Sequence, residues 1–276
     1  MRALKRRLRR WLAYRAALPD LNDFRADIEQ LVGGSVTWRH TGGRGRDVVC
    51  LVLRSGAPVG VLRVTHPDTP PSTPASAGLP FVSLSAGEKI DREWQAYSIG
   101  FPLGLTPKPL WRNTRAMLCA YACAKPLQHE AEAGKASYLL LATDVLSEIA
   151  RLHAAGLTHM DMSLSNILRD ADAQDILFVD FEYGPAAGLS FEQQCLYDYL
   201  RLLESIWKFL KPADRTAAAA LWGDEFLSVA PPAVIAADLT PLRPALGRIL
   251  AAPELREFFG ARLSPNAPAA EPENQP

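Results

Sequence analysis

The residues best suited to chemistry lie in a short block that we call the motif block, residues 159–182. His159, Asp161 and Asn166 form an HxDxxxxN pattern, and Asp180 follows the apolar run Ile176–Val179. Transfer of a phosphoryl group from ATP requires an acceptor hydroxyl that is oriented and relieved of its proton, and a metal ion that neutralises the triphosphate. One carboxylate can serve the first need, and an Asn/Asp pair of oxygen ligands can hold Mg²⁺. The motif block therefore predicts Mg-ATP phosphoryl transfer.

The order and spacing of this block resemble the catalytic and metal-binding loops of the protein-kinase-like superfamily. The resemblance implies that Asp161 accepts or orients the acceptor's proton and that His159 supports the loop. It also implies that Asn166 and Asp180 are the metal ligands, with ATP and Mg²⁺ as cofactors. It covers about residues 36–210 and is specific only in the motif block. The alternative is a chance set of polar loop residues.

A glycine-rich turn precedes this block by more than a hundred residues. Gly42, Gly43 and Gly45 lie between two strand-like segments. Their backbone N–H groups can approach the phosphates of a nucleotide, as in a phosphate-covering loop. Ordinary hairpins also use glycine for positive φ angles, so a simple turn stays open as an alternative.

Arg63 departs from the family pattern, whereas Glu93 matches it. Arg63 stands in the third strand where the family usually has a phosphate-binding lysine, and Glu93 matches the acid that pairs with it. We expect these two residues to form that pair and contact the phosphates. A planar guanidinium does not simply replace an ammonium, so the departure leaves room for a protein that binds nucleotide without turnover.

The pattern of apolar residues predicts the strands and helices that must position these residues. An antiparallel meander is predicted by strand-like segments separated by Gly-containing turns. Ser85 and Glu88 predict a capping box that opens a helix running to about Ile99. Residues 67–80 are expected to be a flexible insertion. The strand-like segments are 35–41, 48–53, 59–64, 109–111 and 116–122.

The later part of the chain is predicted to be helical. Ser137–Ala155 reads as one long helix ended by Gly156, and helices resume near Phe191. We therefore predict an α+β chain with a bilobal protein-kinase-like fold and MgATP in the cleft between its lobes. The expected divisions are a basic helical segment 1–34, a small β-rich N-lobe 35–128 with one helix, a mainly helical C-lobe 129–263 and a disordered tail 264–276.

Several absences argue against an ordinary protein kinase. Ser163 lies two residues after Asp161, where Ser/Thr protein kinases generally carry lysine, and the second motif reads Asp-Phe-Glu rather than Asp-Phe-Gly. No Ala-Pro-Glu follows, and the next helix begins too soon for a long activation segment. The compact block is similar to aminoglycoside and choline phosphotransferases and to the Kdo and heptose kinases of the lipopolysaccharide core.

Among these we favour a lipopolysaccharide core sugar, or a similar glycolipid or small molecule, as the acceptor. The alternatives are a catalytically impaired kinase-like binding or scaffold protein and an atypical protein kinase. Three roles are considered for Glu182: a metal ligand, a group that binds the acceptor, and a loop carboxylate bonded to nearby backbone. Two interpretations are considered for Asp198: a buried acid that braces the catalytic loop through backbone hydrogen bonds, and an exposed acid on the helix.

The N-terminus concentrates positive charge, although the whole chain has a formal net charge of zero. Residues 1–18 contain seven Lys and Arg residues and no acid, and Leu4, Leu8, Trp11 and Leu12 recur at helical spacing. Such a helix suits an anionic membrane surface. A helix packed on the domain and an Arg-rich transit peptide are the alternatives.

The remaining sequence features concern the cellular location of the protein. No apolar run reaches the roughly 18 residues needed to cross a bilayer, and no signal peptide is evident. The four cysteines form no CxxC pair and are expected to be reduced thiols. We predict a cytoplasmic protein with peripheral contact to the inner face of the membrane, and no nucleic-acid partner.

Overall fold

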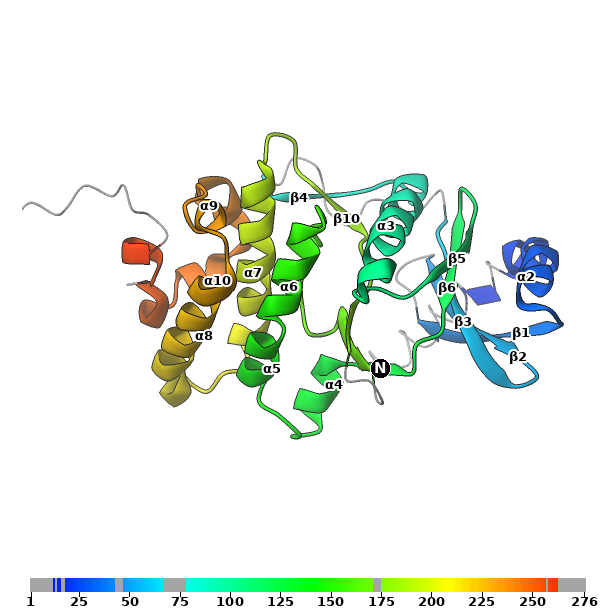
Figure 1. The fold of residues 1–276 in the computed structure, drawn as a ribbon, viewed down its shortest axis with the longest axis horizontal. Coiled ribbons are helices and arrows are strands. Elements are labelled where there is room, and N and C mark those ends of the chain that lie inside the picture. The colour runs from blue at the N-terminus through cyan, green and yellow to red at the C-terminus, as the bar shows by residue number, and fades with distance from the viewer. Residues whose placement is uncertain are drawn as a thin grey trace, which may run out of the picture. The chain divides into compact units, whose positions relative to one another are not determined.

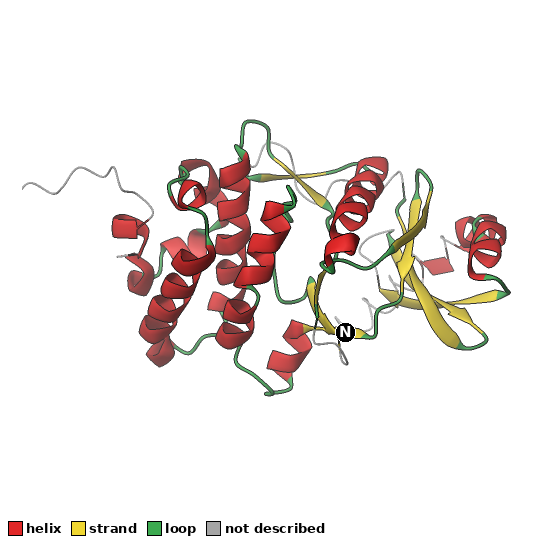
Figure 2. Cartoon of the chain, in the orientation of Figure 1, coloured by secondary structure: helices red, strands yellow, loops and turns green. Residues whose placement is uncertain are grey.

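The computed structural model describes residues 12, 14–15, 18–42, 47–66, 78–170, 175–256 and 258–262 of the 276-residue chain. The described residues form two compact units. The first, which we call the sheet unit, is drawn from residues 1–77, 81–127 and 165–184, and the second, the helical unit, from 78–80, 128–164 and 185–276. Figure 1 labels the elements, and Figure 2 shows the strands of the sheet unit in yellow and the helices in red.

The sheet unit is built on a five-stranded antiparallel sheet with the order β1-β2-β3-β6-β5. Burial alternates along β2, as expected for a strand with one face on a core. Ser55 and Gly56 both have positive φ angles and make the two-residue turn between β2 and β3. The predicted meander is therefore confirmed. The strands are β1 (Val36–Gly42), β2 (Val48–Arg54), β3 (Ala57–Val64), β5 (Pro109–Arg112) and β6 (Ala116–Ala120).

One face of this sheet is covered by residues close to the N-terminus. Helix α2 (Arg25–Val32) contacts β1 and ends at Gly33, which adopts φ 73°. Leu21, Phe24 and Ile28 pack with buried residues of β1, β2, β3 and β6 in a single cluster. Removing such side chains from water is the main force that holds the helix on the sheet.

Helix α3 (Ala86–Gly100) begins with the predicted capping box. The Ser85 hydroxyl accepts from the backbone N–H of Glu88, while the Glu88 carboxylate accepts from the backbone N–H of Ser85 at 2.8 Å. The helix lies alongside β5 and β6 (Figure 1) and continues into the 3₁₀ turn η2 (Phe101–Leu103). The face of α3 that carries Glu93 is thereby buried.

Two small sheets complete the strand inventory of the described residues. β4 (Phe81–Ser83) pairs with β10 (Tyr183–Pro185), and the rings of Phe81 and Tyr183 meet edge to face at 5.0 Å. The other small sheet has the order β7-β8-β9 and is antiparallel. Its strands are β7 (Ala124–Pro126), β8 (Ile167–Asp170) and β9 (Ile176–Phe178).

The helical unit is organised around α7, which contacts α5, α6, α9 and α10. Like α3, α7 opens with a capping box, formed here by Ser190 and Gln193. The α-helices are α4 (Leu127–Glu132), α5 (Tyr138–Asp144), α6 (Leu146–Ala154), α7 (Phe191–Trp207), α8 (Arg215–Val229), α9 (Pro232–Ile235) and α10 (Gly247–Leu250). The shorter turns are η3 (Pro212–Asp214), η4 (Thr240–Ala245), η5 (Pro253–Leu255) and η6 (Phe258–Arg262).

The single helix predicted for residues 137–155 is wrong in one respect, because α5 and α6 are separate helices. Val145 separates them with φ −99° and ψ −1°. Two residues earlier, the hydroxyl of Thr143 donates to the carbonyls of Leu139 at 3.3 Å and Leu140 at 3.0 Å. Side-chain hydrogen bonds of this kind compete with the helical ladder and bend helices. Gly156 does end the second helix, with φ 76°.

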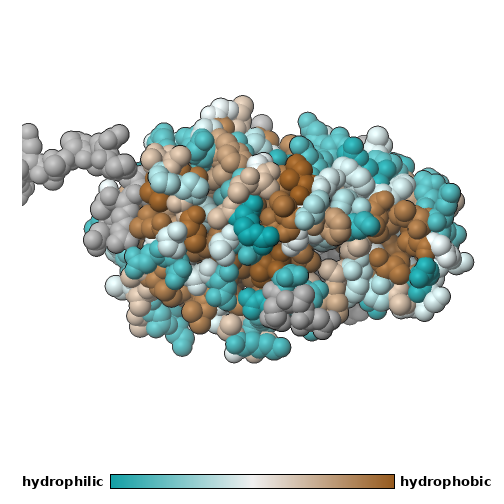
Figure 3. Space-filling model, viewed as in Figure 1, coloured by the Kyte–Doolittle hydropathy of each residue, from teal (hydrophilic) through white to brown (hydrophobic). Residues whose placement is uncertain are grey.

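The predicted α+β fold class is confirmed by a β-rich sheet unit that carries α3 and a mainly helical second unit. The segment 165–184 belongs to the sheet unit. Within the described ranges, no helix is long and apolar enough to cross a membrane. On the face drawn in Figure 3, apolar residues lie in separate patches among polar ones. The predictions for residues 1–11, 67–77 and 264–276 fall outside the described residues.

Candidate functional site

A cavity of about 290 Å³ lies within the sheet unit. Its apolar walls come from β2, β3 and β6, where Val49, Val61 and Met117 line it. Polar side chains from distant parts of the sequence line the same cavity. These are Arg63 on β3, Glu93 on α3, and Asn166 and Asp180 beside the small sheet. An apolar cavity with a few convergent polar groups is the usual form of a small-molecule site.

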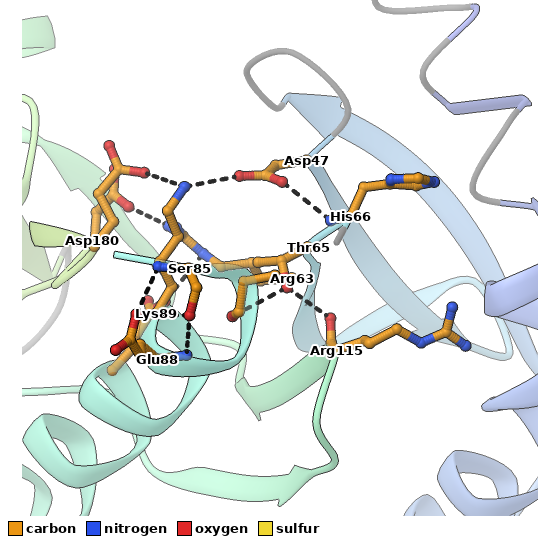
Figure 4. Close-up of polar contacts among 12 residues, drawn as sticks. Asp47, Arg63, Thr65, His66, Ser85, Glu88, Lys89, Arg115 and Asp180 are labelled. Atoms are coloured by element: carbon orange, nitrogen blue, oxygen red, sulfur yellow. Dashed lines mark hydrogen bonds and ion pairs between the residues drawn. The ribbon is translucent and has the colours of Figure 1, made fainter. Parts of the chain in front are cut away.

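Arg63 pairs with two carboxylates in this cavity. Its Nε lies 3.0 Å from Oε2 of Glu93, and its Nη2 donates to Oδ1 of Asp180. The Arg63 side chain is 17% exposed and that of Glu93 4% exposed, so solvent screens the first pair only weakly. The predicted Arg63–Glu93 ion pair is present, and Figure 4 shows Arg63 extending toward Asp180.

Burial and charge act in opposite directions on these groups. Burial raises the pKa of Glu93 above its ordinary value, against the opposing effect of the Arg63 charge. Burial disfavours the charged form of Arg63, yet the carboxylates of Asp180 and Glu93 hold its pKa well above the ordinary value. Arg63 is therefore a permanent positive charge at the polar end of the cavity.

Asn166 and Asp180 are brought together by the β8–β9 hairpin. Asn166 directly precedes β8 and Asp180 follows β9, and the strands run antiparallel with Ile167 opposite Phe178. The backbone N–H of Val179 donates to the carbonyl of Asn166 at 3.0 Å. Two residues that lie 14 positions apart therefore meet at one end of a hairpin and line the same cavity.

The backbone of Asp180 is in the left-handed region, with φ 72°. Non-glycine residues rarely adopt this conformation, and where they do so the strain commonly belongs to a functional site. The conformation is maintained although it is unfavourable for a residue with a Cβ atom. This observation singles out Asp180 independently of its spacing in the sequence.

The donor set of this cavity fits Mg²⁺. Asn166 and Asp180 supply the oxygen ligands that a hard cation prefers. Among the described residues, no group of three or more His, Cys, Asp or Glu side chains forms a closed metal site. Proteins usually hold Mg²⁺ through one or two carboxylates, with water and substrate phosphates as the other ligands.

Lys89 is a second cation close to these residues. Its Nζ lies 3.3 Å from Oδ2 of Asp47 and 3.9 Å from Oε2 of Glu182. Oδ1 of Asp47 also accepts from the backbone N–H of His66 at 3.2 Å. Figure 4 shows Lys89 between Asp47 and the 180–182 segment. Lys89 thus links α3, the end of the glycine-rich turn and the segment after β9.

The loop of the HxD pattern, residues 159–161, lies in the helical unit, where Asp198 of α7 holds its backbone. Asp198 is fully buried, and its two oxygens accept from the backbone N–H groups of His159 and Met160, each at 2.7 Å. His153 Nε2 lies 3.1 Å from Oδ2 of Asp198. Met160 has φ 65°, so the loop is fixed in a strained conformation. Of the two interpretations of Asp198, the buried brace is correct.

Asp161 follows directly and carries the carboxylate proposed for proton transfer. Its Oδ1 accepts from Nη2 of Arg201 at 2.9 Å, and its side chain is 24% exposed. The backbone N–H of Asp161 lies 3.3 Å from Nδ1 of His159 and donates to it. The loop predicted from the HxD pattern is therefore held both at its backbone and at its carboxylate.

The predicted site residues fall into three groups. Arg63, Glu93, Asn166 and Asp180 line one cavity of the sheet unit, whereas Asp161 belongs to the helical unit. Gly42 is the last residue of β1. The predicted phosphate-covering role of Gly43 and Gly45 falls outside the described residues.

Sequence reasoning missed Lys89 and Arg201. Lys89 lies four residues before Glu93, so that helical spacing places both on one face of α3. Arg201 lies three residues after Asp198 and shares its face of α7 by the same rule. Both residues could have been found by following the helical face of a residue already selected.

Comparison with known proteins gave structural neighbours only, since no family model and no curated protein matches the chain. One neighbour is the PknI kinase domain of Mycobacterium tuberculosis, in a form with two substitutions. It is 18% identical, with 78% of this chain and 94% of that chain covered and a TM-score of 0.45. Another is the Rio2 kinase from Chaetomium thermophilum in an ADP/Mg²⁺–phosphoaspartate complex. It is 18% identical, with 89% of this chain and 73% of that chain covered and a TM-score of 0.47.

Proposed function

We propose that this chain is an ATP-dependent phosphotransferase that phosphorylates a hydroxyl group of a non-protein acceptor. The observation that carries the proposal is the cavity of the sheet unit in which Arg63 meets both Glu93 and Asp180, with Asn166 on the same wall. A fixed cation, an oxygen-ligand pair and apolar walls are the three parts that binding of a metal–nucleotide complex requires.

In this proposal each residue has a separate task. Arg63, oriented by Glu93, binds the phosphates, and the apolar walls hold the base. Asn166 and Asp180 would hold Mg²⁺, which would supply neutralisation of the phosphate charge. Asp161 orients the acceptor hydroxyl and takes its proton. Gly42, Gly43 and Gly45 are proposed to cover the phosphates.

The acceptor that we propose is a lipopolysaccharide core sugar or a similar glycolipid or small molecule. Ser163 and the Asp-Phe-Glu sequence support a non-protein acceptor, and β10 is followed at Phe191 by α7. The short connection leaves little chain for a peptide-binding activation segment. Residues 1–18 would keep the enzyme at the inner leaflet, where a lipid-linked sugar is accessible.

Calorimetric titration with ATP, with and without Mg²⁺, tests the nucleotide site. We expect binding that strengthens when Mg²⁺ is present. A chain that binds no nucleotide under either condition would contradict the proposal. The acceptor is then tested by transfer of labelled phosphate to purified core oligosaccharides containing Kdo or heptose, with a generic protein substrate in parallel. Label on the protein alone would favour an atypical protein kinase.

A catalytically impaired, nucleotide-binding scaffold is the second candidate. The observation that favours it is the contact between Nη2 of Arg63 and Oδ1 of Asp180, because this guanidinium occupies an oxygen that the metal would use. This candidate predicts nucleotide binding without transfer. Substitution Arg63→Lys, which shortens the hydrogen-bonding reach of the cation, would then be expected to create activity rather than reduce it.

A further inference from the structure

One face of α7 holds three consecutive residues of the catalytic loop. Asp198 and Arg201 lie three positions apart and therefore project from the same side of the helix. Asp198 accepts from the backbone N–H groups of His159 and Met160, and Arg201 donates to the side chain of Asp161. Helix α7 thus fixes the path of the loop through Asp198 and the direction of the Asp161 carboxylate through Arg201.

The Arg201–Asp161 contact has the features of a structured ion pair. The distance from Nη2 to Oδ1 is 2.9 Å, and the side chains are 26% and 24% exposed. Charge-assisted hydrogen bonds of this length are about twice as strong as neutral ones, and partial burial reduces their screening by salt. Arg201 belongs to a long helix whose other residues are largely buried, so the guanidinium is anchored on a rigid element.

Tyr197 is a buried neighbour of this pair on the helix that carries Arg201. Tyr197 is one helical turn before Arg201 and is fully buried. Burial raises the pKa of its phenol, the nearby positive charge of Arg201 lowers it, and the negative charge of Asp161 raises it. The phenol therefore interacts electrostatically with both members of the pair.

The chemistry of phosphoryl transfer gives such a pair a use. Placement errors of about 1 Å at a reacting group can cost about 10²-fold in rate, so the carboxylate that orients an acceptor must be held in one rotamer. A guanidinium in contact with Oδ1 of Asp161 limits the rotation of that carboxylate.

We propose that Arg201 is a positioning residue that holds the carboxylate of Asp161 in the orientation required for phosphoryl transfer. This inference rests on the proposed function, and it adds a residue that neither the motif block nor the cavity of the sheet unit contains. It also explains why an arginine stands on the loop-facing side of α7, between residues that are almost all buried.

The test compares Arg201→Met, Arg201→Lys and a matched control, Arg151→Met, in the full chain. Arg151 is also in the helical unit and pairs with Glu148 at 2.5 Å, but it does not belong to the loop. ATP affinity is measured by calorimetry, and transfer to water is measured as Mg²⁺-dependent release of ADP. We expect Arg201→Met to keep ATP affinity within about twofold and to lose turnover by about 10- to 100-fold. Arg201→Lys should recover part of the loss, and Arg151→Met should match the wild-type chain.

A double-substitution cycle separates positioning from a general effect on the fold. If Arg201 acts through Asp161, adding Arg201→Met to Asp161→Asn should lower turnover less than about twofold further. Full additivity of the two losses, or wild-type turnover in Arg201→Met, would overturn the inference and leave the proposed function intact. A wild-type chain that neither binds ATP in the presence of Mg²⁺ nor releases ADP would remove the proposed function itself, and the role of Arg201 with it.

Discussion

Arg63 contacts Asp180 across 117 positions of the sequence, through Nη2 of the guanidinium and Oδ1 of the carboxylate. The same guanidinium pairs with Glu93, so one positive charge is shared between two carboxylates that line the cavity. This relationship makes Arg63 a structural residue of the sheet unit as well as a proposed phosphate ligand. Its removal is therefore expected to have consequences that can be measured without any substrate.

Substitution Arg63→Met should lower the free energy of unfolding by about 3 kcal/mol, because it leaves the buried carboxylate of Glu93 without its partner. The double variant Arg63→Met/Glu93→Gln should recover much of that loss, since it removes the uncompensated charge. Urea denaturation of the single and double variants measures both values. Arg112→Met is the control, because its pair with Asp91 is exposed and should contribute less than about 1 kcal/mol. Equal losses at Arg63 and Arg112 would contradict the buried-pair argument.

Glu93 and Glu88 should give opposite pH dependences of stability. Burial raises the pKa of Glu93, so the folded state binds its proton more tightly than the unfolded state does, and stability falls as pH rises from about the ordinary value, 4.5, through the raised pKa. The hydrogen bonds of the capping box lower the pKa of Glu88, so its contribution is present above pH 4.5 and is lost as pH falls through the lowered value.

Urea denaturation between about pH 3 and about pH 8, a range that begins below the ordinary glutamate pKa of 4.5 and extends well above it, tests this contrast. Relative to Glu93→Gln, the wild-type chain should lose stability as pH rises. Relative to Glu88→Gln, it should lose stability as pH falls. Slopes of the same sign for the two comparisons would show that burial does not dominate at Glu93.

The sequence predicted the parts of this molecule that depend on local patterns. Alternation of apolar residues gave the meander, and the Ser85/Glu88 pair gave the start of α3. The HxD spacing and the apolar strand before Asp180 were sufficient to select Asn166 and Asp180, the two residues that meet at one end of the β8–β9 hairpin. These features are visible locally because periodicity and capping act over a few residues.

What the sequence could not show depends on long-range packing. The break at Val145 arises from the side chain of Thr143 competing for helical carbonyls, and no proline or glycine marks it. The contacts of Lys89 with Asp47 and Glu182 require the three segments to be brought together by the folded chain. The contact between Arg201 and Asp161 likewise joins residues 40 positions apart. No local pattern encodes these pairings.

Asp161→Asn should leave ATP affinity unchanged and lower turnover by about 10²- to 10⁴-fold, the usual contribution of a positioned acid–base group. The amide keeps the shape of the carboxylate and can still accept a hydrogen bond from Arg201, but it cannot take the acceptor's proton. Calorimetry gives the affinity, and ADP release gives the turnover. Normal turnover in this variant would show that Asp161 is not the base.

Asp180→Ala and Asn166→Ala should both remove the strengthening of ATP binding by Mg²⁺, because each deletes a proposed oxygen ligand. Asp175→Asn is the control, since Asp175 is an exposed acid directly before β9 that does not line the cavity. Titrations of ATP with and without Mg²⁺ measure the metal-dependent part of the affinity for each variant. An Asp180→Ala chain whose ATP affinity still increases with Mg²⁺ would contradict the assignment of the ligands.

The proposed membrane contact of residues 1–18 predicts binding to anionic vesicles that depends on salt. Basic side chains near an anionic surface contribute about 1 kcal/mol each, and added salt screens this attraction. Sedimentation with phosphatidylserine-containing vesicles should retain the wild-type chain at low salt and release it as salt increases, while neutral vesicles should bind little. A chain lacking residues 1–18 should stay in the supernatant and keep its affinity for ATP, because the cavity residues lie in other segments. If the shortened chain sediments as strongly as the full one, the membrane contact lies elsewhere or does not exist.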